Sequence, residues 1–347
     1  MVRNEIISLF HQVGRILHVV ANDLAYTNQS LAITKDELER FRLAVRTMER
    51  QNPWFTEIHV KQALAGVAIW LNEEKLKEWL ADYPVSKSPK NVGIIMAGNI
   101  PMVGFHDFLC VILSGHKAHC KLSSQDALLW QAFFQMCEVI DSRISEHYIF
   151  SSGLMKDFDA VIATGSNNSA ITFKNYFDKY PHIIRQNRTS IAVLSGRETD
   201  QDLEALSDDI FSYYGFGCRN VSQIFVPEDF DIQRLFGAFV KYGDYINHNK
   251  YMNNYDYYRS LYMLNGENVL ENGFILLRIA QDLHAPPAVL NCHRYSAYEK
   301  VETFISEKSE QIQVVIGFNG TPFGQAQCPS LTDYADGVDV MSFLDEL

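Results

Sequence analysis

The chain has 347 residues, which suggests roughly two domains at about 150 residues each, and its 47% hydrophobic and 21% charged residues are typical of globular proteins. Its 42 acidic and 30 basic residues give a formal charge of −12, which argues against nucleic-acid binding and against docking on anionic membranes. No apolar run approaches the ~18 residues of a membrane-spanning helix, and Glu5 lies where a signal peptide would be apolar, so we expect a cytoplasmic protein without a membrane span.

The first ~85 residues have a helical pattern. Apolar residues recur at spacings of three and four, which places them on one helix face: Ile6, Phe10, Val13, Leu17 and Val20. Further helical patterns cover 35–50, 60–70 and 73–79. The polar segment 82–90 contains two prolines and is typical of a connector.

From residue 91 onward, short apolar runs alternate with helical segments. The sequence predicts strands at 92–96, 117–122, 148–150, 160–163, 182–185 and 191–194, with helices ending at 113 and covering 126–140 and 168–179. This alternation is typical of an α/β domain with a largely parallel sheet.

A second α/β region follows Gly196, with predicted helices at 201–213, 231–246 and 296–306 and predicted strands at 223–226 and 314–316. The tyrosine-rich stretch 247–258 is expected to be an excursion or a lid, whose aromatic rings serve packing or an interface more readily than a planar ligand. We therefore expect one domain over 1–196, a second over 197–320 and a C-terminal tail over 321–347.

The six cysteines are widely separated and form no C-x-x-C pair, so neither a zinc ribbon nor a thioredoxin-type site is expected. Five of them are expected to be buried free thiols. Cys218 differs because Gly215 and Gly217 leave room beside it for a substrate carbonyl, and Arg219 supplies a charge that favours the nucleophilic thiolate. A structural cysteine is the alternative on these local features.

Two other predicted strands end in loops with polar groups. Asn99 offers a side-chain amide that can donate to an oxyanion, and the alternative is that it caps the next helix. Gly165 and Ser166 lie in a strand-to-helix turn whose backbone N–H groups suit a pyrophosphate, although Gly-Ser-Asn is also a common helix cap.

Several familiar motifs are missing from the sequence, among them G-x-G-x-x-G, the P-loop, G-x-S-x-G and H-E-x-x-H. His116 and His119 do not form a convincing metal pair, because residues three apart in a strand face opposite sides. No metal site is predicted.

Together these loops resemble the aldehyde dehydrogenase superfamily, in the same order along the chain. The segment Asn99-x-Pro is similar to the loop whose Asn helps to form that family's oxyanion hole. Cys218, followed by the strand Ser-Gln-Ile-Phe-Val, resembles the family's catalytic cysteine and its next strand. The resemblance therefore implies that Cys218 and Asn99 are catalytic.

The cofactor residues follow from the same resemblance. The stretch 115–123 is similar to the family's strand whose lysine contacts the adenosine ribose, and the resemblance assigns that role to Lys121. Thr-Gly-Ser at 164–166 resembles the family's turn beside the cofactor. The resemblance therefore assigns Gly165 and Ser166 to cofactor binding. The resemblance implies an α/β fold of the aldehyde dehydrogenase type, with a Rossmann-type cofactor-binding domain plus a second α/β catalytic domain.

One departure separates this chain from the hydrolytic branch of the superfamily, whose Glu-Leu-Gly-Gly loop activates water. The corresponding stretch 188–196 has no carboxylate, as suits an acyl-enzyme that is reduced instead of hydrolysed. This stretch and the closing Asp-Tyr-Ala-Asp-Gly at 333–337 resemble the LuxC-type acyl-CoA reductases, which make aldehydes from acyl thioesters with NADPH.

The resemblance implies an NADPH-dependent reductase of long-chain acyl-CoA or another acyl thioester, with a Cys-bound acyl-enzyme. It also implies a homodimer and leaves room for an acyl-donor protein partner. The alternatives are a CoA-acylating or ordinary aldehyde dehydrogenase, or a catalytically inactive binding protein of the same fold.

Overall fold

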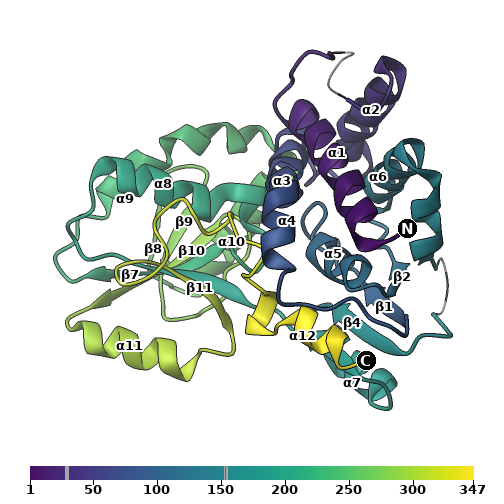
Figure 1. Ribbon diagram of the computed structural model, residues 1–347. Helices are drawn as coiled ribbons and strands as arrows, with labels where there is room; N and C mark the ends of the chain where they lie inside the picture. The colour runs from purple at the N-terminus through teal and green to yellow at the C-terminus, as the bar shows by residue number, and fades with distance from the viewer. Residues whose placement is uncertain (28–30, 152, 154) are drawn as a thin grey trace. The chain divides into compact units, whose positions relative to one another are not determined.

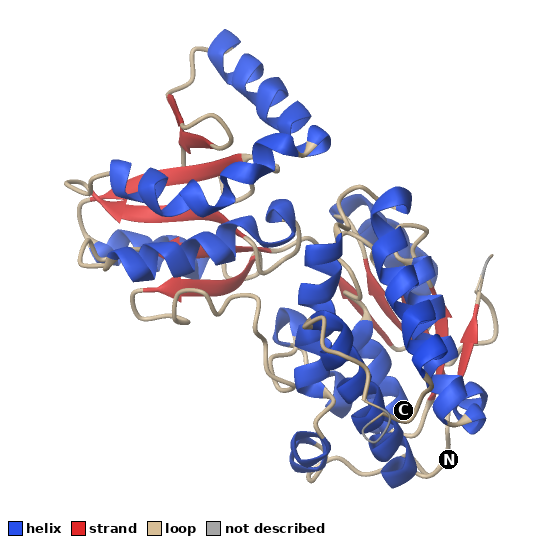
Figure 2. Cartoon of the chain, turned by 90° about the horizontal axis from the view of Figure 1, so that it is seen from above, coloured by secondary structure: helices blue, strands red, loops and turns tan. Residues whose placement is uncertain are grey.

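The computed structural model describes residues 1–27, 31–151, 153 and 155–347. The described chain divides into two compact units: Met1–Gln186 with Ser330–Leu347 form unit 1, and Asn187–Pro329 form unit 2. Each unit contains its own β-sheet with helices packed against it (Figures 1 and 2). Among the residues described, no helix is both long and apolar enough to cross a bilayer.

Unit 1 is built on a five-stranded parallel sheet in the order β3-β2-β1-β4-β5. Its strands are β1 (Asn91–Ile95), β2 (Lys117–Lys121), β3 (Tyr148–Phe150), β4 (Ala160–Thr164) and β5 (His182–Arg185). The central strands are buried on both faces, which explains why they were recognisable as short apolar runs.

Helices cover both faces of this sheet. α5 (Phe105–Leu113) leads from β1 to β2, and α7 (Asn167–Phe177) leads from β4 to β5 in the opposite direction across the sheet. Connections between parallel strands are almost always right-handed, and these two run in opposite directions, so the two helices lie on opposite faces (Figure 1). α6 (Ala127–Ile140) leads from β2 toward β3.

The N-terminal part of unit 1 is helical, as predicted. Its helices are α1 (Arg3–Ala21), α2 (Lys35–Gln51), α3 (Glu57–Trp70) and α4 (Glu73–Trp79). The predicted apolar stripe of α1 is buried along its whole length. Thr34 and Glu37 form a reciprocal capping box that starts α2.

Unit 2 holds a six-stranded sheet in the order β11-β6-β7-β10-β9-β8. Its strands are β6 (Thr189–Val193), β7 (Val221–Pro227), β8 (Val269–Glu271), β9 (Leu276–Ile279), β10 (Val289–Tyr295) and β11 (Ile312–Gly317), and only the edge pair β8–β9 is antiparallel. The helices of this unit are α8 (Asp200–Phe211), α9 (Gln233–Phe239), α10 (Asn249–Leu264) and α11 (Tyr298–Glu307), and α8 and α11 lie on opposite sides of the sheet (Figure 1). The two α/β units have the predicted fold class.

The unit boundary lies earlier than the predicted one after residue 196. β6 pairs in parallel with β7 and β11, so the chain has already entered the second sheet at Thr189. The tail also differs in extent, because 321–329 stay with unit 2 and only Ser330 onward belongs to unit 1. There Tyr334 accepts a hydrogen bond from the Trp79 indole at 2.9 Å, and α12 (Val340–Asp345) ends the chain.

Most of the stretch 247–258, which was expected to be an excursion or a lid, forms the first turns of α10. Tyr251, Tyr255 and Tyr262 lie on one buried face of this helix, because spacings of four and seven residues return to the same side. Three strands between 269 and 295 were not predicted. β10 shows why: Asn291 interrupts its apolar run, yet its buried amide donates to the carbonyls of Asp282 and His284.

Candidate active site

The carboxyl ends of the strands of unit 1 carry four of the five predicted site residues. The chain leaves β1 toward β2 on one side, while β4 and β5 lie on the other, so the strand order reverses between β1 and β4. In open α/β sheets, ligands bind outside the carboxyl ends at such a switch point. Asn99 follows β1, Gly165 and Ser166 follow β4, and Lys121 ends the neighbouring strand β2.

Asn99 lies exposed in the loop 96–104, which joins β1 to α5. The N-cap residue of α5 is Gly104, so the alternative in which Asn99 caps this helix is wrong. The loop contains strained backbone at Met102, whose φ of 57° lies in the left-handed region that non-glycine residues rarely adopt. Within the described part of the chain, the Asn99 amide has no hydrogen-bond partner, which leaves its N–H groups available to a ligand.

Lys121 is the last residue of β2 and is half-buried. Its carbonyl accepts a hydrogen bond from the N–H of Met96 at 3.1 Å, which extends the pairing with β1 by one residue. Its ammonium forms no ion pair with any residue that the structure describes. A lysine in this state at the ligand-binding edge of the sheet suits a phosphate or a ribose.

Ser166 is the N-cap residue of α7, and its hydroxyl accepts a hydrogen bond from the N–H of Ser169 at 3.2 Å. The capping role that the sequence left open is therefore confirmed. Gly165 allows this turn to close, because a Cβ there would lie 2.9 Å from the Cβ of Ser169. The turn presents the amino end of an eleven-residue helix at the carboxyl edge of the sheet, where a helix dipole favours a phosphate.

Cys218 belongs to unit 2 and lies in the loop between α8 and β7. Gly215 (φ 85°) and Gly217 (φ 99°) both adopt backbone angles that favour glycine, and Cys218 itself is half-exposed. Its carbonyl accepts a hydrogen bond from the Ser190 hydroxyl at 3.0 Å, which ties the loop to the start of β6. The side chain of Arg219 donates to the carbonyl of Ala326 at 3.3 Å.

Two tyrosines hold this loop from its N-terminal side. Tyr213 (φ 54°) and Tyr214 (φ 57°) are both left-handed and both buried. The ring of Tyr214 lies 4.4 Å from that of Tyr245 and 4.3 Å from that of His248. Strain of this kind in bulky residues persists only where packing over-determines it.

The remaining thiols differ from one another. Cys110, Cys120, Cys137 and Cys292 are buried, and burial raises their pKa, in Cys292 to about 12. The prediction of five buried thiols is wrong for Cys328, which is exposed in the segment that leads back to unit 1. A chemical test of Cys218 must therefore account for Cys328.

Glu198 and Asp126 are among the buried carboxylates that sequence reasoning missed. Glu198 follows β6, where its oxygens accept hydrogen bonds from the Ser195 N–H at 2.5 Å, the Ser195 hydroxyl at 2.8 Å and the Gly196 N–H at 3.0 Å. Asp126 precedes α6, and at the sequence level an aspartate before a helix indicates only a cap. Nothing local distinguishes either residue from a surface carboxylate.

His116 and His119 bind separate partners within unit 1 and do not converge on a shared metal position. The His116 ring shares hydrogen bonds with the Lys90 N–H at 3.0 Å and the Leu344 carbonyl at 2.9 Å, whereas the His119 ring bonds the Ser151 hydroxyl at 2.9 Å. Both rings thus serve the packing of unit 1.

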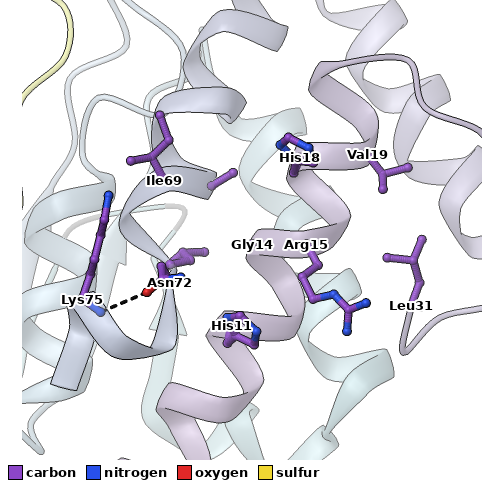
Figure 3. A pocket seen from close by; sticks show the side chains of 11 residues that line it. His11, Gly14, Arg15, His18, Val19, Leu31, Ile69, Asn72 and Lys75 are labelled. Carbon is purple, nitrogen blue, oxygen red and sulfur yellow. Dashed lines mark hydrogen bonds between the residues drawn. The ribbon is translucent and has the colours of Figure 1, made fainter. Parts of the chain in front are cut away.

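A groove of about 480 Å³ lies along α1, α3 and α4 (Figure 3). His11, Arg15, His18 and Lys75 contribute to its lining together with apolar side chains such as Ile69. None of the predicted site residues lines it.

The sequence matches the family model described as acyl-CoA reductase (LuxC) over residues 11–235. No curated protein matches the chain. Solved aldehyde dehydrogenases share its fold. A mutant indole-3-acetaldehyde dehydrogenase from P. syringae is 13% identical with a TM-score of 0.65, and the match covers 91% of this chain and 72% of that one.

Two further structures agree. The aldehyde dehydrogenase from Bacillus cereus is 14% identical with a TM-score of 0.60, covering 91% of this chain and 72% of that one. Aldehyde dehydrogenase 21 from Physcomitrella patens is 12% identical with a TM-score of 0.59, covering 89% and 73%. At these identities the likeness concerns the fold, which is of the aldehyde dehydrogenase type, as the sequence resemblance implied.

Proposed function

This chain belongs to the LuxC family of acyl-CoA reductases, and from that membership we propose that it reduces a long-chain acyl thioester to an aldehyde with NADPH. The observation that carries the proposal is the setting of Cys218. It is a half-exposed thiol in a loop with two left-handed glycines, whereas four of the other five thiols are buried. A nucleophile needs this access to a carbonyl carbon.

In the first half-reaction the Cys218 thiolate attacks the thioester carbonyl. A new bond forms between Sγ and the carbonyl carbon, the bond from that carbon to the CoA sulfur breaks, and CoA leaves as a thiolate that takes up a proton. The acyl group then remains on Cys218 as a thioester. Splitting the transfer in this way replaces one difficult step by two easier ones.

The residues at the carboxyl edge of unit 1 fit a nicotinamide nucleotide. The Lys121 ammonium, which has no ion-pair partner in the described chain, suits the adenosine ribose and its 2′-phosphate, while the turn at Gly165 and Ser166 suits the pyrophosphate. The P. syringae and Bacillus cereus structures are complexes with NAD+. When bound, the cofactor supplies a hydride, which is the two-electron chemistry that side chains lack.

Asn99 is proposed as the donor to the oxyanion that develops on the acyl carbon in both half-reactions. Its exposed amide forms no hydrogen bond within the described chain. A hydrogen bond to the oxyanion would therefore stabilise the transition state without breaking an existing one. After reduction, the tetrahedral carbon expels the Cys218 thiolate and the aldehyde leaves.

The position of Glu198 argues against the hydrolytic alternative. Ser190 contacts the Cys218 loop at the start of β6, whereas Glu198 binds the turn after the opposite end of that strand. Five strand residues span roughly 16 Å, and the Glu198 oxygens are already used by three donors. This carboxylate is therefore not a base for water at Cys218.

The test is to trap the acyl-enzyme. Incubation with a long-chain acyl-CoA and no NADPH should add one acyl mass at Cys218, because hydrolysis lacks a general base, and addition of NADPH should release the aldehyde. Peptide mass spectrometry maps the adduct. The Cys218→Ser variant should release no aldehyde.

The matched control is Cys328→Ser, which removes the one other thiol that is exposed. This variant should form the adduct and the aldehyde at the wild-type rate. Acylation that maps to Cys328, or aldehyde production by Cys218→Ser, contradicts the mechanism.

The same proposal includes acyl-CoA as the donor, with an acyl-protein as the other candidate donor, a homodimeric state and a cytoplasmic location. These parts come from the family resemblance. Measuring turnover with acyl-CoA against an acylated carrier protein distinguishes the two donors.

A further inference from the structure

The segment that follows β2 contacts the Asn99 loop at two points, one on each side of Asn99. On one side, Gly98 lies so close to Ser123 that a Cβ at Gly98 would lie 2.3 Å from the Ser123 hydroxyl oxygen. On the other side, the N–H of Met102 donates to the carboxylate of Asp126 at 3.1 Å. Both contacts come from within 122–126, which is the continuation of the strand that ends in Lys121.

Asp126 occupies the N-cap position of α6 but does not cap it. An aspartate there ordinarily accepts a hydrogen bond from an N–H of its own first turn. Here Oδ2 accepts instead from the Met102 N–H and from the Trp130 indole at 2.8 Å, while Oδ1 has no partner among the described residues. The side chain therefore binds the Asn99 loop instead of an N–H of its own helix.

The hydrogen bond between the Met102 N–H and the Asp126 carboxylate is shielded from water. Asp126 is fully buried, and no charged neighbour compensates for its burial, so desolvation raises the pKa of its carboxyl to about 7 against the effect of its two hydrogen bonds. In a water-excluded interior a hydrogen bond is electrostatically stronger than it is in water. The donor in this bond is the N–H of Met102, the left-handed residue of the loop.

We propose that Asp126 is a positioning residue, which fixes the Asn99 loop through the Met102 N–H and so sets the position of the Asn99 amide. The inference rests on the proposed role of Asn99. It also implies that the cofactor residue Lys121 and the oxyanion donor Asn99 are held by one rigid segment, since 122–126 follows directly from β2.

The test compares Asp126→Ala and Asp126→Asn with the parent enzyme. Asp126→Ala should lower kcat by about 10- to 100-fold with little change in KM for acyl-CoA, as expected when a donor is displaced by a fraction of an ångström. Asp126→Asn keeps an acceptor oxygen for Met102 and should recover most of this loss. A merely structural role would not produce that recovery.

Asp339→Ala is the matched control for stability. Asp339 is also an N-cap aspartate of unit 1, but it caps its own helix α12 through the Ser342 N–H at 3.0 Å and accepts from the Tyr83 hydroxyl at 2.8 Å. Its removal should lower the melting temperature and leave kcat unchanged.

A double-mutant cycle shows whether Asp126 acts through Asn99. In an Asn99→Ala background, Asp126→Ala should cause little further loss of kcat, because the group that it positions is gone. A loss as large as in the parent enzyme, or an unchanged kcat in Asp126→Ala itself, overturns the inference.

Hydrogen exchange separates this inference from the proposed function. Exchange of the amides in 96–104 should speed up in Asp126→Ala and not in Asp339→Ala, whatever reaction the enzyme catalyses. Unchanged exchange in that loop overturns the inference even if acyl-CoA is reduced. Faster exchange in Asp126→Ala, together with a wild-type protein that reduces no acyl thioester, overturns the proposed function alone.

Discussion

Asn99 is the site residue whose structural role can be separated most cleanly from its chemical one. Gly104 takes the N-cap position of α5, and the loop is fastened through Gly98 and Met102. The Asn99 side chain itself therefore contributes little to folding. Its replacement reports on chemistry.

We expect Asn99→Ala to lose ~2.7–4 kcal/mol of transition-state stabilisation, because one preformed oxyanion donor is removed. The melting temperature should barely change. Asn99→Asp, which has the same size but no amide N–H, should show at least the same loss. Steady-state kcat/KM and thermal unfolding measure the two effects, and retained turnover in both variants refutes the oxyanion role.

Strand β2 begins and ends with a lysine, and only the second lies at the carboxyl edge of the sheet. Lys121 is half-buried there, whereas Lys117 is exposed at the amino end of the same strand. This pair separates the effect of position from the effect of charge.

Lys121→Ala should weaken NADPH binding by about tenfold or more, since a charge-assisted contact to phosphate is lost, and should affect kcat less. Lys117→Ala removes the same charge from the other end of β2 and should leave NADPH affinity unchanged. Calorimetric titration of both variants provides the comparison. Equal affinity in Lys121→Ala and the wild type removes Lys121 from the cofactor site.

Helix α7 offers a second test at the same edge. Ser166→Asp keeps an N-cap acceptor for the Ser169 N–H and adds a negative charge at the helix amino end, so the stability of the protein should be maintained. The same charge should repel a pyrophosphate and weaken NADPH binding. Ser166→Ala should instead cost ~1 kcal/mol of stability. An unchanged nucleotide affinity in Ser166→Asp places the pyrophosphate elsewhere.

The pH dependence of stability belongs to the whole molecule, and Asp126 contributes to it with an unusual sign. Its pKa in the folded protein, about 7, lies above the ordinary value of 3.8. Between these values the folded state binds the proton more tightly than the unfolded state does. The contribution of Asp126 is therefore present at low pH and is lost as pH rises through about 7.

Asp126→Asn cannot titrate, so its free energy of unfolding should lack this decline. The wild type should lose stability relative to Asp126→Asn between about pH 4 and about pH 7, by up to roughly 4 kcal/mol. Carboxylates with a lowered pKa, such as Asp339 and Glu271, have the opposite effect on the free energy of unfolding, which they lower as the pH falls. This effect is the same in both proteins, so it cancels when their free energies of unfolding are subtracted. Chemical unfolding at several pH values measures this difference, and parallel pH profiles contradict the raised pKa.

Much of the fold follows from short-range patterns in the sequence. The stripe from Ile6 to Val20 and the apolar runs at β1 and β4 depend only on which faces each element must bury, so their periodicity identified them. The open loop around Cys218 was predictable for a similar reason, because Gly215 and Gly217 lie within three residues of it. The order of the motifs carried the family resemblance, and the matched family model confirmed the family.

What the tertiary structure alone decided depends on partners that are distant in sequence. β6 belongs to the second sheet because β7 and β11 pair with it, and the tyrosines of α10 are helical core because they return to one face. Asp126 has the sequence context of a helix cap, yet it binds Met102, 24 residues away. A carboxylate's role is set by the N–H groups that fold around it once water has been excluded, and no local pattern encodes that.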